Sequence, residues 1–455
     1  MQKNKIIHIA IIIIGILFIA IPVFHSNMWF DESYSVALSN HNYGEIWSIG
    51  RNDVHPILYY WVLHTVGLIF GKSIISYRLF SVLCTTLLGL IGYTHIRKDF
   101  GEKTGILFSF LVFFLPVNVI YSGEIRMYSF TMFLVTLMSI YAYRIFSFGD
   151  RTQPKRTVPE RKGPSPNEKD RPQVKNWILF SIFSLASAYT HYYGLMIAGI
   201  ENLFLFIVYI VKSYKEKKML KELKISIISA IVQVLLYIPW IMALFGQMKS
   251  VSQGFWIQIE FPKTYIELFT FPFIGNLDVI YIIIPIALIF ATIFYGYLIY
   301  IHIKNLKDKE LNIARLSMLF WILVVLGAWT VSKVLSKTVL YARYLLCIEG
   351  LLIFVISYTM VKRGNKIANI IICGISVILS ISVLCTLVNE NYGKSNMEFQ
   401  KYINDNIKED DTFICCNDLG GFVISASFPN NKLYFYDVDN WQCRTSVQSI
   451  WRNGV

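Results

Sequence analysis

The chain has 455 residues, of which 55% are hydrophobic and 16% are charged, and its mean hydropathy is +0.51. Soluble globular proteins have about 25% charged residues, so this composition excludes a water-soluble enzyme. With 13 prolines and 26 glycines, the chain is neither disordered nor collagen-like. A net charge of +13 is common in nucleic-acid-binding proteins. Here the basic residues are distributed as in a membrane protein, so we expect a lipid bilayer and no nucleic acid as partner.

About 11 apolar stretches are long enough to cross a hydrocarbon core of ~30 Å as helices that rise ~1.5 Å per residue. They lie at 6–24, 76–96, 104–121, 127–146, 177–192, 195–213, 225–245, 278–303, 315–332, 340–361 and 367–388. No small-residue cleavage site follows the first stretch, so we interpret it as a retained helix and not a signal peptide. The stretch 57–70 has 14 residues and reaches only about 21 Å, which is too short to span.

Lysine and arginine gather in six segments that together hold 27 basic and 10 acidic residues. These segments are 1–5, 97–103, 144–175, 212–224, 304–315 and 362–366. The positive-inside rule places them in the cytoplasm, which is consistent only if 57–70 does not cross. We therefore expect 57–70 to lie along the outer interface as an amphipathic helix. This predicts an integral, multi-pass plasma membrane protein with its N-terminus inside and its C-terminus outside the cell.

The predicted fold is an all-α polytopic membrane domain over residues 1–388. Its first outer loop, 25–75, would carry the interfacial helices. The loop at 149–175 is rich in proline and charge, which predicts disorder on the cytoplasmic side.

The polar tail, 389–455, would form a small extracytoplasmic α/β segment. One helical and two strand-like patterns fall near 396–407, 412–416 and 432–436. Cys415 and Cys416 are candidates for a disulfide with Cys443, which spacing alone does not decide.

Two neighbouring acids, Asp31 and Glu32, follow the first span beside Trp29 and Phe30. Solvation at the membrane surface would explain such a pair. A carboxylate in a region of low dielectric can also have its pKa tuned for general-base catalysis. We therefore take Asp31 and Glu32 as the candidate catalytic residues.

Further polar residues fall on the same predicted outer side. Candidate phosphate ligands are His55, Arg126, Lys337 and Arg343, because arginine binds phosphate with a bidentate fork. Snorkelling toward lipid headgroups is the alternative for these cations. The other candidate substrate-binding residues are Asp53, Tyr59, Glu124, His191, Tyr192 and Trp256. Asp53 is equally well explained as a helix cap, and His191 as a packed interfacial residue.

The order of these motifs resembles a known family. Phe30-Asp31-Glu32 with Tyr34, and Asp53, His55-Pro56 and Tyr59-Tyr60, are similar to the first outer loop of bacterial and archaeal family 39-type glycosyltransferases. These belong to the membrane-embedded GT-C superfamily, together with protein O-mannosyltransferases and aminoarabinose transferases. Segments 121–128, 189–194, 255–256 and 342–344 resemble later family segments, so the resemblance covers roughly residues 25–345. One departure is that Ile57 follows Pro56, where the family often has a second proline.

The resemblance implies an inverting glycosyltransferase with a polyprenyl- or dolichyl-phosphate-linked sugar donor. The acceptor would be a hydroxyl group of a glycan, a lipid or a protein. Asp31 matches the family's catalytic acidic residue and would act as the general base. Nearby cations would stabilise the departing lipid phosphate. A single displacement needs one base, unlike retaining enzymes, which have two carboxylates ~5 Å apart.

Cofactor needs and competing functions stay open at this point. No cofactor is required by the resemblance, but some relatives use a divalent metal, for which Asp31, Glu32 and Asp53 are candidate ligands. No nucleotide-binding or zinc-protease motif is present in the sequence. The alternatives are a polysaccharide ligase or polymerase, and a transporter or flippase of a lipid-linked sugar. Glu201 and Glu349, inside predicted spans, would suit the transporter.

Overall fold

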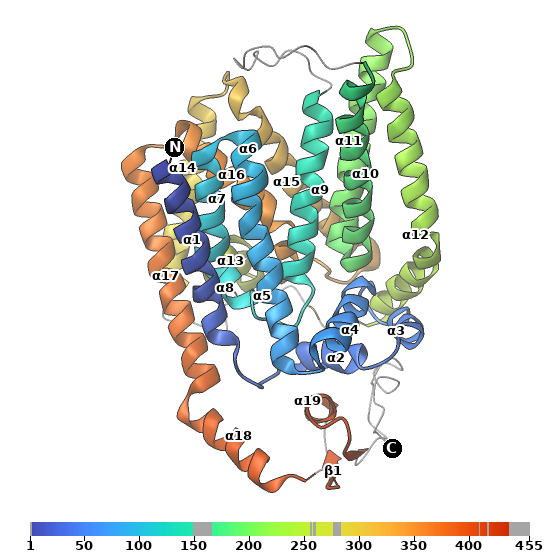
Figure 1. Cartoon of the computed structure of the whole chain (residues 1–455), viewed down its shortest axis with the longest axis vertical. Coiled ribbons are helices and arrows are strands. Elements are labelled where there is room, and N and C mark those ends of the chain that lie inside the picture. The colour runs from blue at the N-terminus through green and yellow to red at the C-terminus, as the bar shows by residue number, and fades with distance from the viewer. Residues whose placement is uncertain are drawn as a thin grey trace.

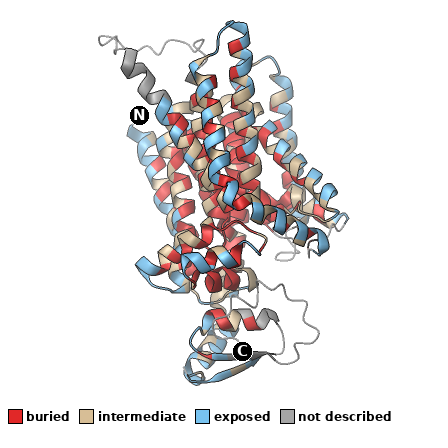
Figure 2. Cartoon of the chain, turned by 90° about the vertical axis from the view of Figure 1, so that its right-hand side faces the viewer, coloured by how far each residue is buried: buried red, intermediate tan, exposed pale blue. Residues whose placement is uncertain are grey.

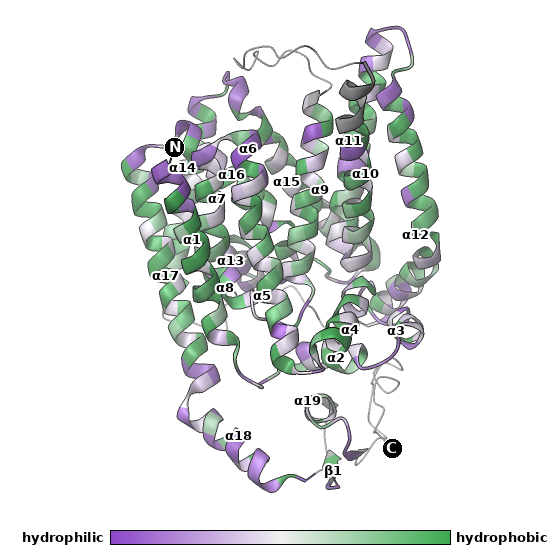
Figure 3. Cartoon of the chain, in the orientation of Figure 1, coloured by the Kyte–Doolittle hydropathy of each residue, from purple (hydrophilic) through white to green (hydrophobic). Residues whose placement is uncertain are grey.

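The computed structural model describes residues 2–148, 166–254, 257, 261–275, 284–408, 410–415 and 418–435. Most of these residues form helices that run along one common axis (Figure 1). Buried residues concentrate in the centre of this bundle (Figure 2). The long helices are predominantly hydrophobic between two more hydrophilic ends (Figure 3), as expected for a body that crosses a membrane.

The bundle consists of long helices joined by shorter ones. The long helices are α1 (Gln2–Ala20), α5 (Ile74–Ile91), α9 (Tyr128–Phe148), α10 (Pro166–Thr190), α11 (Tyr192–Lys215), α12 (Lys221–Gln253), α14 (Ile284–Lys304), α15 (Asn312–Leu335), α16 (Glu349–Arg363) and α17 (Lys366–Tyr392). The shorter ones are η1 (Ile21–Val23), η2 (Gly92–Ile96), α6 (Arg97–Phe100), α7 (Glu102–Phe114), α8 (Pro116–Tyr121), α13 (Lys263–Ile274), η4 (Lys309–Leu311) and η5 (Ala342–Ile348). In α16 with η5, 94% of the most apolar stretch is buried, so this segment is the central one of the bundle.

Among the described residues, nine helical segments are long and apolar enough to cross a membrane. The predicted spans 104–121 and 177–192 are not among these nine. The first is broken into α7 and α8 because Leu115 is extended before Pro116, as residues that precede proline prefer. The second lies in α10, which packs against α9 and α11. The predicted number of about 11 spans stays a prediction.

Helix α10 begins at Pro166, inside the loop 149–175 that we expected to be disordered. Proline suits this first helical position, and the disorder expected for the loop stays a prediction. The rest of the loop, 149–165, lies outside the described residues.

Three short helices lie across one end of the bundle: α2 (Phe30–Ser39), α3 (Tyr43–Gly50) and α4 (Leu58–Phe70) (Figure 1). We call them the first-loop helices, and the end that they cover the loop end. Helix α4 corresponds to the short stretch 57–70 and, as expected, does not run along the bundle. The ring nitrogen Nδ1 of His64 lies 2.8 Å from the carbonyl oxygen of Ser39, which joins α4 to the end of α2.

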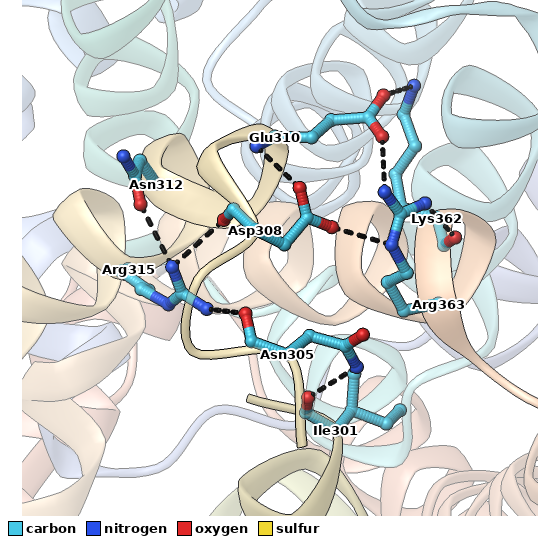
Figure 4. A network of polar contacts seen from close by, with 8 residues as sticks. All are labelled: Ile301, Asn305, Asp308, Glu310, Asn312, Arg315, Lys362 and Arg363. Carbon is cyan, nitrogen blue, oxygen red and sulfur yellow. Dashed lines mark hydrogen bonds and ion pairs between the residues drawn. The ribbon is translucent and has the colours of Figure 1, made fainter. Parts of the chain in front are cut away.

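The opposite end of the bundle carries the N-terminus and the described basic turns between helices (Figures 1 and 3). Here Arg363 Nε donates to Asp308 Oδ2 at 2.6 Å, and Lys362 Nζ donates to Glu310 Oε1 at 2.6 Å (Figure 4). These pairs join the turn between α14 and α15 to the end of α16. They are partly exposed, so each stabilises the fold by at most about 1 kcal/mol.

The C-terminal tail lies at the loop end (Figure 1). Its elements are α18 (Lys394–Asn406), β1 (Thr412–Cys415), α19 (Asp418–Ser427) and β2 (Lys432–Phe435). The two strands are parallel, in a register that runs from Thr412 beside Lys432 to Cys415 beside Phe435. Helix α19 packs against α2. The expected helix and strands coincide with α18, β1 and β2, whereas Cys416 and Cys443 lie outside the described residues.

Candidate active site between the first-loop helices and the bundle

Both candidate catalytic acids lie in the first turn of α2. This position suits negative charge, because the first backbone N–H groups of a helix have no partner within the helix. The N–H of Trp29 points to Glu32 Oε2 at 3.4 Å. The helix start thereby holds Asp31 and Glu32 next to each other at the loop end.

The carboxylate of Glu32 is fully engaged. Arg78, in α5, binds it with both Nη atoms, at 2.6 Å to Oε1 and 3.0 Å to Oε2. The N–H of Ile125 donates to Oε1 at 2.9 Å. Arg78 also donates to the carbonyl oxygens of Gly123, at 2.9 Å, and of Asn27. Glu32 and Arg78 are both buried and connect α2, α5 and the loop between α8 and α9.

Arg78 is a residue of this site that the sequence alone did not indicate. Arg78 lies near the start of a predicted span. A charged side chain at such a position in a membrane protein is by default a candidate for a functional site. The stretch 76–96 was interpreted only as a span, and the partner Glu32 is 46 residues away in the sequence.

Asp31 forms an ion pair with Arg343 of η5. Its Oδ2 lies 3.0 Å from Arg343 Nη2, and its side chain is 19% exposed, against 5% for Arg343. The guanidinium of Arg343 lies 4.8 Å from the ring centroid of Trp29 and 5.2 Å from that of Tyr341. Such aromatic contacts hold a buried cation in place. Asp31 is thus the more accessible member of a pair whose cation is enclosed.

A second buried arginine, Arg126, lies on the other side of Asp31. Its Nη1 donates to the backbone oxygen of Asp31 at 3.0 Å and to Ser35 Oγ at 3.1 Å. Its Nη2 lies 3.3 Å from His55 Nε2. Because arginine only donates hydrogen bonds, this geometry makes His55 Nε2 an acceptor. Arg126, Arg343 and His55, three of the four predicted phosphate ligands, are therefore brought together around Asp31.

Glu124 follows α8 and has one carboxyl oxygen, Oε2, that is buried and hydrogen-bonds to none of the described residues. Burial of the carboxyl, and next the negative charge of Glu32, raise the pKa of Glu124 to about 8. With this pKa the carboxyl of Glu124 is mostly protonated at neutral pH.

Two cavities border this cluster of charged residues. Arg343 is part of the wall of the first, and the next residue in the chain, Tyr344, is part of the wall of the second. The first is the more polar of the two, so we call it the polar cavity, and it has a volume of about 490 Å³. Its lining includes His25, Asn27, Trp29, Glu32, Arg78, Glu124, Arg343, Glu390 and Asn391. The second is mainly apolar and has a volume of about 240 Å³. Its lining includes His55, His191, Tyr192, Leu195, Met196, Leu244, Val251, Leu335 and Tyr344.

The remaining predicted site residues have different surroundings. Tyr192 lines the apolar cavity and its hydroxyl donates to Gln247. Tyr59 is buried in α4, 5.6 Å from Tyr60 between ring centroids, and Asp53 is buried just after α3. Lys337 is half-buried after α15 and lines neither cavity. Trp256 lies outside the described residues.

The proposed metal ligands do not form a metal site in the described part of the chain. There, no three His, Cys, Asp or Glu side chains are grouped so that they could hold a metal ion. Glu32 is occupied by Arg78, and Asp31 is paired with Arg343. Asp31, Glu32 and Asp53 therefore do not fit a divalent metal, and we derive no step from one.

Comparison with known proteins identifies the class of this architecture. The model of the dolichyl-phosphate-mannose-protein mannosyltransferase family matches residues 54–156, which include Arg78, Glu124 and Arg126. No curated protein sequence matches the chain.

Two crystal structures of ArnT from Cupriavidus metallidurans are similar to this chain. The apo structure has a TM-score of 0.61 and the structure bound to undecaprenyl phosphate one of 0.57. Both are 9% identical in sequence, and the similarity covers 98% of this chain and 87% of ArnT. At this identity the similarity establishes the fold. The chain is an integral membrane protein with the GT-C fold, as the resemblance predicted. The family whose model matches residues 54–156 is also a family of glycosyltransferases.

Proposed function

We propose that this protein is an inverting glycosyltransferase that moves a sugar from a polyprenyl-phosphate-linked donor to a hydroxyl acceptor. The observation that carries the proposal is the position of Asp31. Its carboxylate, the more exposed member of the pair with Arg343, lies beside two buried arginines, in a cluster that borders a polar and an apolar cavity. The undecaprenyl phosphate bound to ArnT, a protein of the same fold, supports a polyprenyl phosphate as the lipid carrier.

The donor's isoprenoid chain would occupy the apolar cavity. Its wall is made by α11, α12 and α15 and includes Leu195, Met196, Leu244 and Leu335, which suit a hydrocarbon chain. Its lining also includes His55, which contacts Arg126. The donor phosphate would therefore lie near Arg126 and Arg343, which can bind its oxygens by charge-assisted hydrogen bonds.

The acceptor would enter from the polar cavity. Its lining offers an exposed aromatic ring, Trp29, and several donors and acceptors, among them Asn27 and Asn391. This combination suits a sugar or another hydroxyl-rich group. Asp31 is not part of the wall of this cavity, but its partner Arg343 is, so an acceptor hydroxyl would reach Asp31 from the side of Arg343.

The chemical step is a single displacement. The acceptor oxygen forms a bond to the anomeric carbon, and its proton passes to Asp31. The bond from the anomeric carbon to the phosphate oxygen breaks, and the electron pair leaves with the lipid phosphate. Arg126 and Arg343 stabilise the negative charge that develops on this leaving group.

Before the donor is bound, the carboxylate of Asp31 is paired with Arg343. A donor phosphate competes for the same guanidinium, because both are anions that bind arginine. Once Arg343 binds phosphate, the carboxylate of Asp31 is free to accept a proton. Glu32 has no free oxygen for such a role, so we assign it to positioning α2.

The site would face the outside of the cell. The described basic turns lie at the end of the bundle opposite the first-loop helices. The positive-inside rule makes the basic end cytoplasmic, which supports an extracytoplasmic position of Asp31 and the tail at the plasma membrane.

The test is sugar transfer by the purified protein with a polyprenyl-phosphate-linked sugar. Asp31→Asn keeps the side-chain shape but removes the base, and we expect turnover to fall by at least about 10²-fold. The matched control is Asp99→Asn, which also removes the acid of an arginine pair, at 2.8 Å from Arg144 at the opposite end. The control should retain wild-type turnover. Wild-type turnover in Asp31→Asn would refute the proposal.

A further inference from the structure

His191 is the residue between α10 and α11, and its ring caps the start of α11. The backbone N–H of Tyr193 donates to His191 Nδ1 at 3.1 Å. The residue is extended, with φ −156° and ψ 147°, as is typical of an N-cap. Because Nδ1 accepts this hydrogen bond, it carries no proton. A neutral ring must then carry its proton on Nε2.

The ring of His191 is uncharged at neutral pH. Burial, and next the positive charges of Arg126 and Arg343, lower the pKa of His191 to about 3. The other titratable groups that face the ring are His55 and the tyrosines 128, 193 and 344, whose ring centroids lie between 5.1 and 6.1 Å away. His191 is thus a fixed, uncharged N–H donor.

This donor has no partner within the described residues. His191 is 2% exposed, its Nε2 is buried, and none of the described groups accepts a hydrogen bond from it. A buried donor without an acceptor destabilises the folded protein. The arrangement is therefore expected where a ligand supplies the acceptor.

The lining of the cavity indicates which ligand this is. His191 and His55 both line the apolar cavity, and their rings are 5.6 Å apart. The ring of Tyr128 lies 6.1 Å from that of His191 and 5.8 Å from the guanidinium of Arg343. An anionic group held by Arg126 and Arg343 would bring an acceptor oxygen to this wall.

We infer that the Nε2–H of His191 donates a hydrogen bond to a phosphate oxygen of the lipid-linked donor. This inference rests on the proposed function, since it takes the apolar cavity as the site of the donor. A neutral donor at this point adds binding without a further buried charge. The two arginines alone then balance the negative charge of the leaving phosphate.

Two substitutions separate the two nitrogens of the ring. In His191→Asn the amide can replace Nδ1, which keeps the helix cap but removes the donor at Nε2. In His191→Gln the amide reaches the position of Nε2, which keeps the donor but loses the cap. Undecaprenyl phosphate serves as the binding probe. The thermal stability of each variant in detergent shows whether the cap at the start of α11 is kept.

We expect His191→Asn to bind undecaprenyl phosphate about tenfold more weakly at near wild-type thermal stability. His191→Gln should be less stable to heat but bind within about twofold of the wild type. Wild-type affinity in the Asn variant, or equal losses of affinity in both variants, would overturn the inference while leaving the proposed function intact. Failure of the wild-type protein to bind undecaprenyl phosphate would instead overturn the proposed function, and this inference with it.

Discussion

At the scale of single residues, the site depends on charges that the fold keeps apart from water. Asp31 and Glu32 are neighbours in sequence, but Asp31 pairs with Arg343 and Glu32 with Arg78. The accessible member of the two is Asp31, whereas Glu32 is 2% exposed. Two adjacent carboxylates can thus have different roles, because their partners come from different helices.

The protonation state of Glu124 leads to a pH dependence of donor binding. Its pKa is raised to about 8, so the carboxyl is neutral below that pH and negative above it. A negative charge beside the phosphate site would repel the donor. We therefore expect donor affinity to fall by up to tenfold per pH unit above about pH 8.

Glu124→Gln tests this dependence, because glutamine stays neutral at all pH values. The KM for a sugar-linked donor, whose phosphodiester does not titrate in this range, is measured from pH 6.5 to 9.5. The variant should lack the loss of affinity above pH 8 that the wild type has. The same alkaline loss in both proteins would show that Glu124 is not its cause.

At the scale of elements, hydropathy predicted the long helices, and length separated α4 from them. Position along the chain could not predict which helices meet at the site. Asp31 and Arg343 are 312 residues apart, and their contact arises only when the fold brings η5 close to the first turn of α2. The break between α7 and α8 was missed because Pro116 lies within an apolar run, and hydropathy alone does not register proline.

The ion pair of Glu32 and Arg78 joins three elements, and its loss has a predictable cost. Arg78→Met leaves a buried carboxylate without its cation, which should lower the free energy of unfolding by about 3–5 kcal/mol. Unfolding is measured in detergent. The double variant Arg78→Met with Glu32→Gln should recover much of the lost free energy of unfolding, because it no longer buries an unpaired negative charge.

Arg144→Met is the matched control for Arg78→Met. Its pair with Asp99 lies at the opposite end and is more exposed, at 19% and 13% of the two side chains. We expect a smaller loss of stability there. Equal losses for both arginines would contradict a special structural role of Arg78.

At the scale of the whole molecule, the bundle separates its basic end from the end that carries the first-loop helices and the tail (Figures 1 and 3). The sequence predicted this polarity from loop charge alone. It also placed most candidate site residues at one end, because each follows or precedes a span. Lys337 was assigned by position in the same way, although it lines neither cavity.

We propose above all that the donor phosphate takes Arg343 from Asp31 in the charged cluster that both cavities border. A structure of the wild-type protein with bound undecaprenyl phosphate tests this most directly. The account predicts phosphate oxygens within hydrogen-bond distance of Arg343 and Arg126, and an Asp31 carboxylate no longer paired with Arg343. A phosphate bound elsewhere, with the ion pair still intact at 3.0 Å, would contradict it.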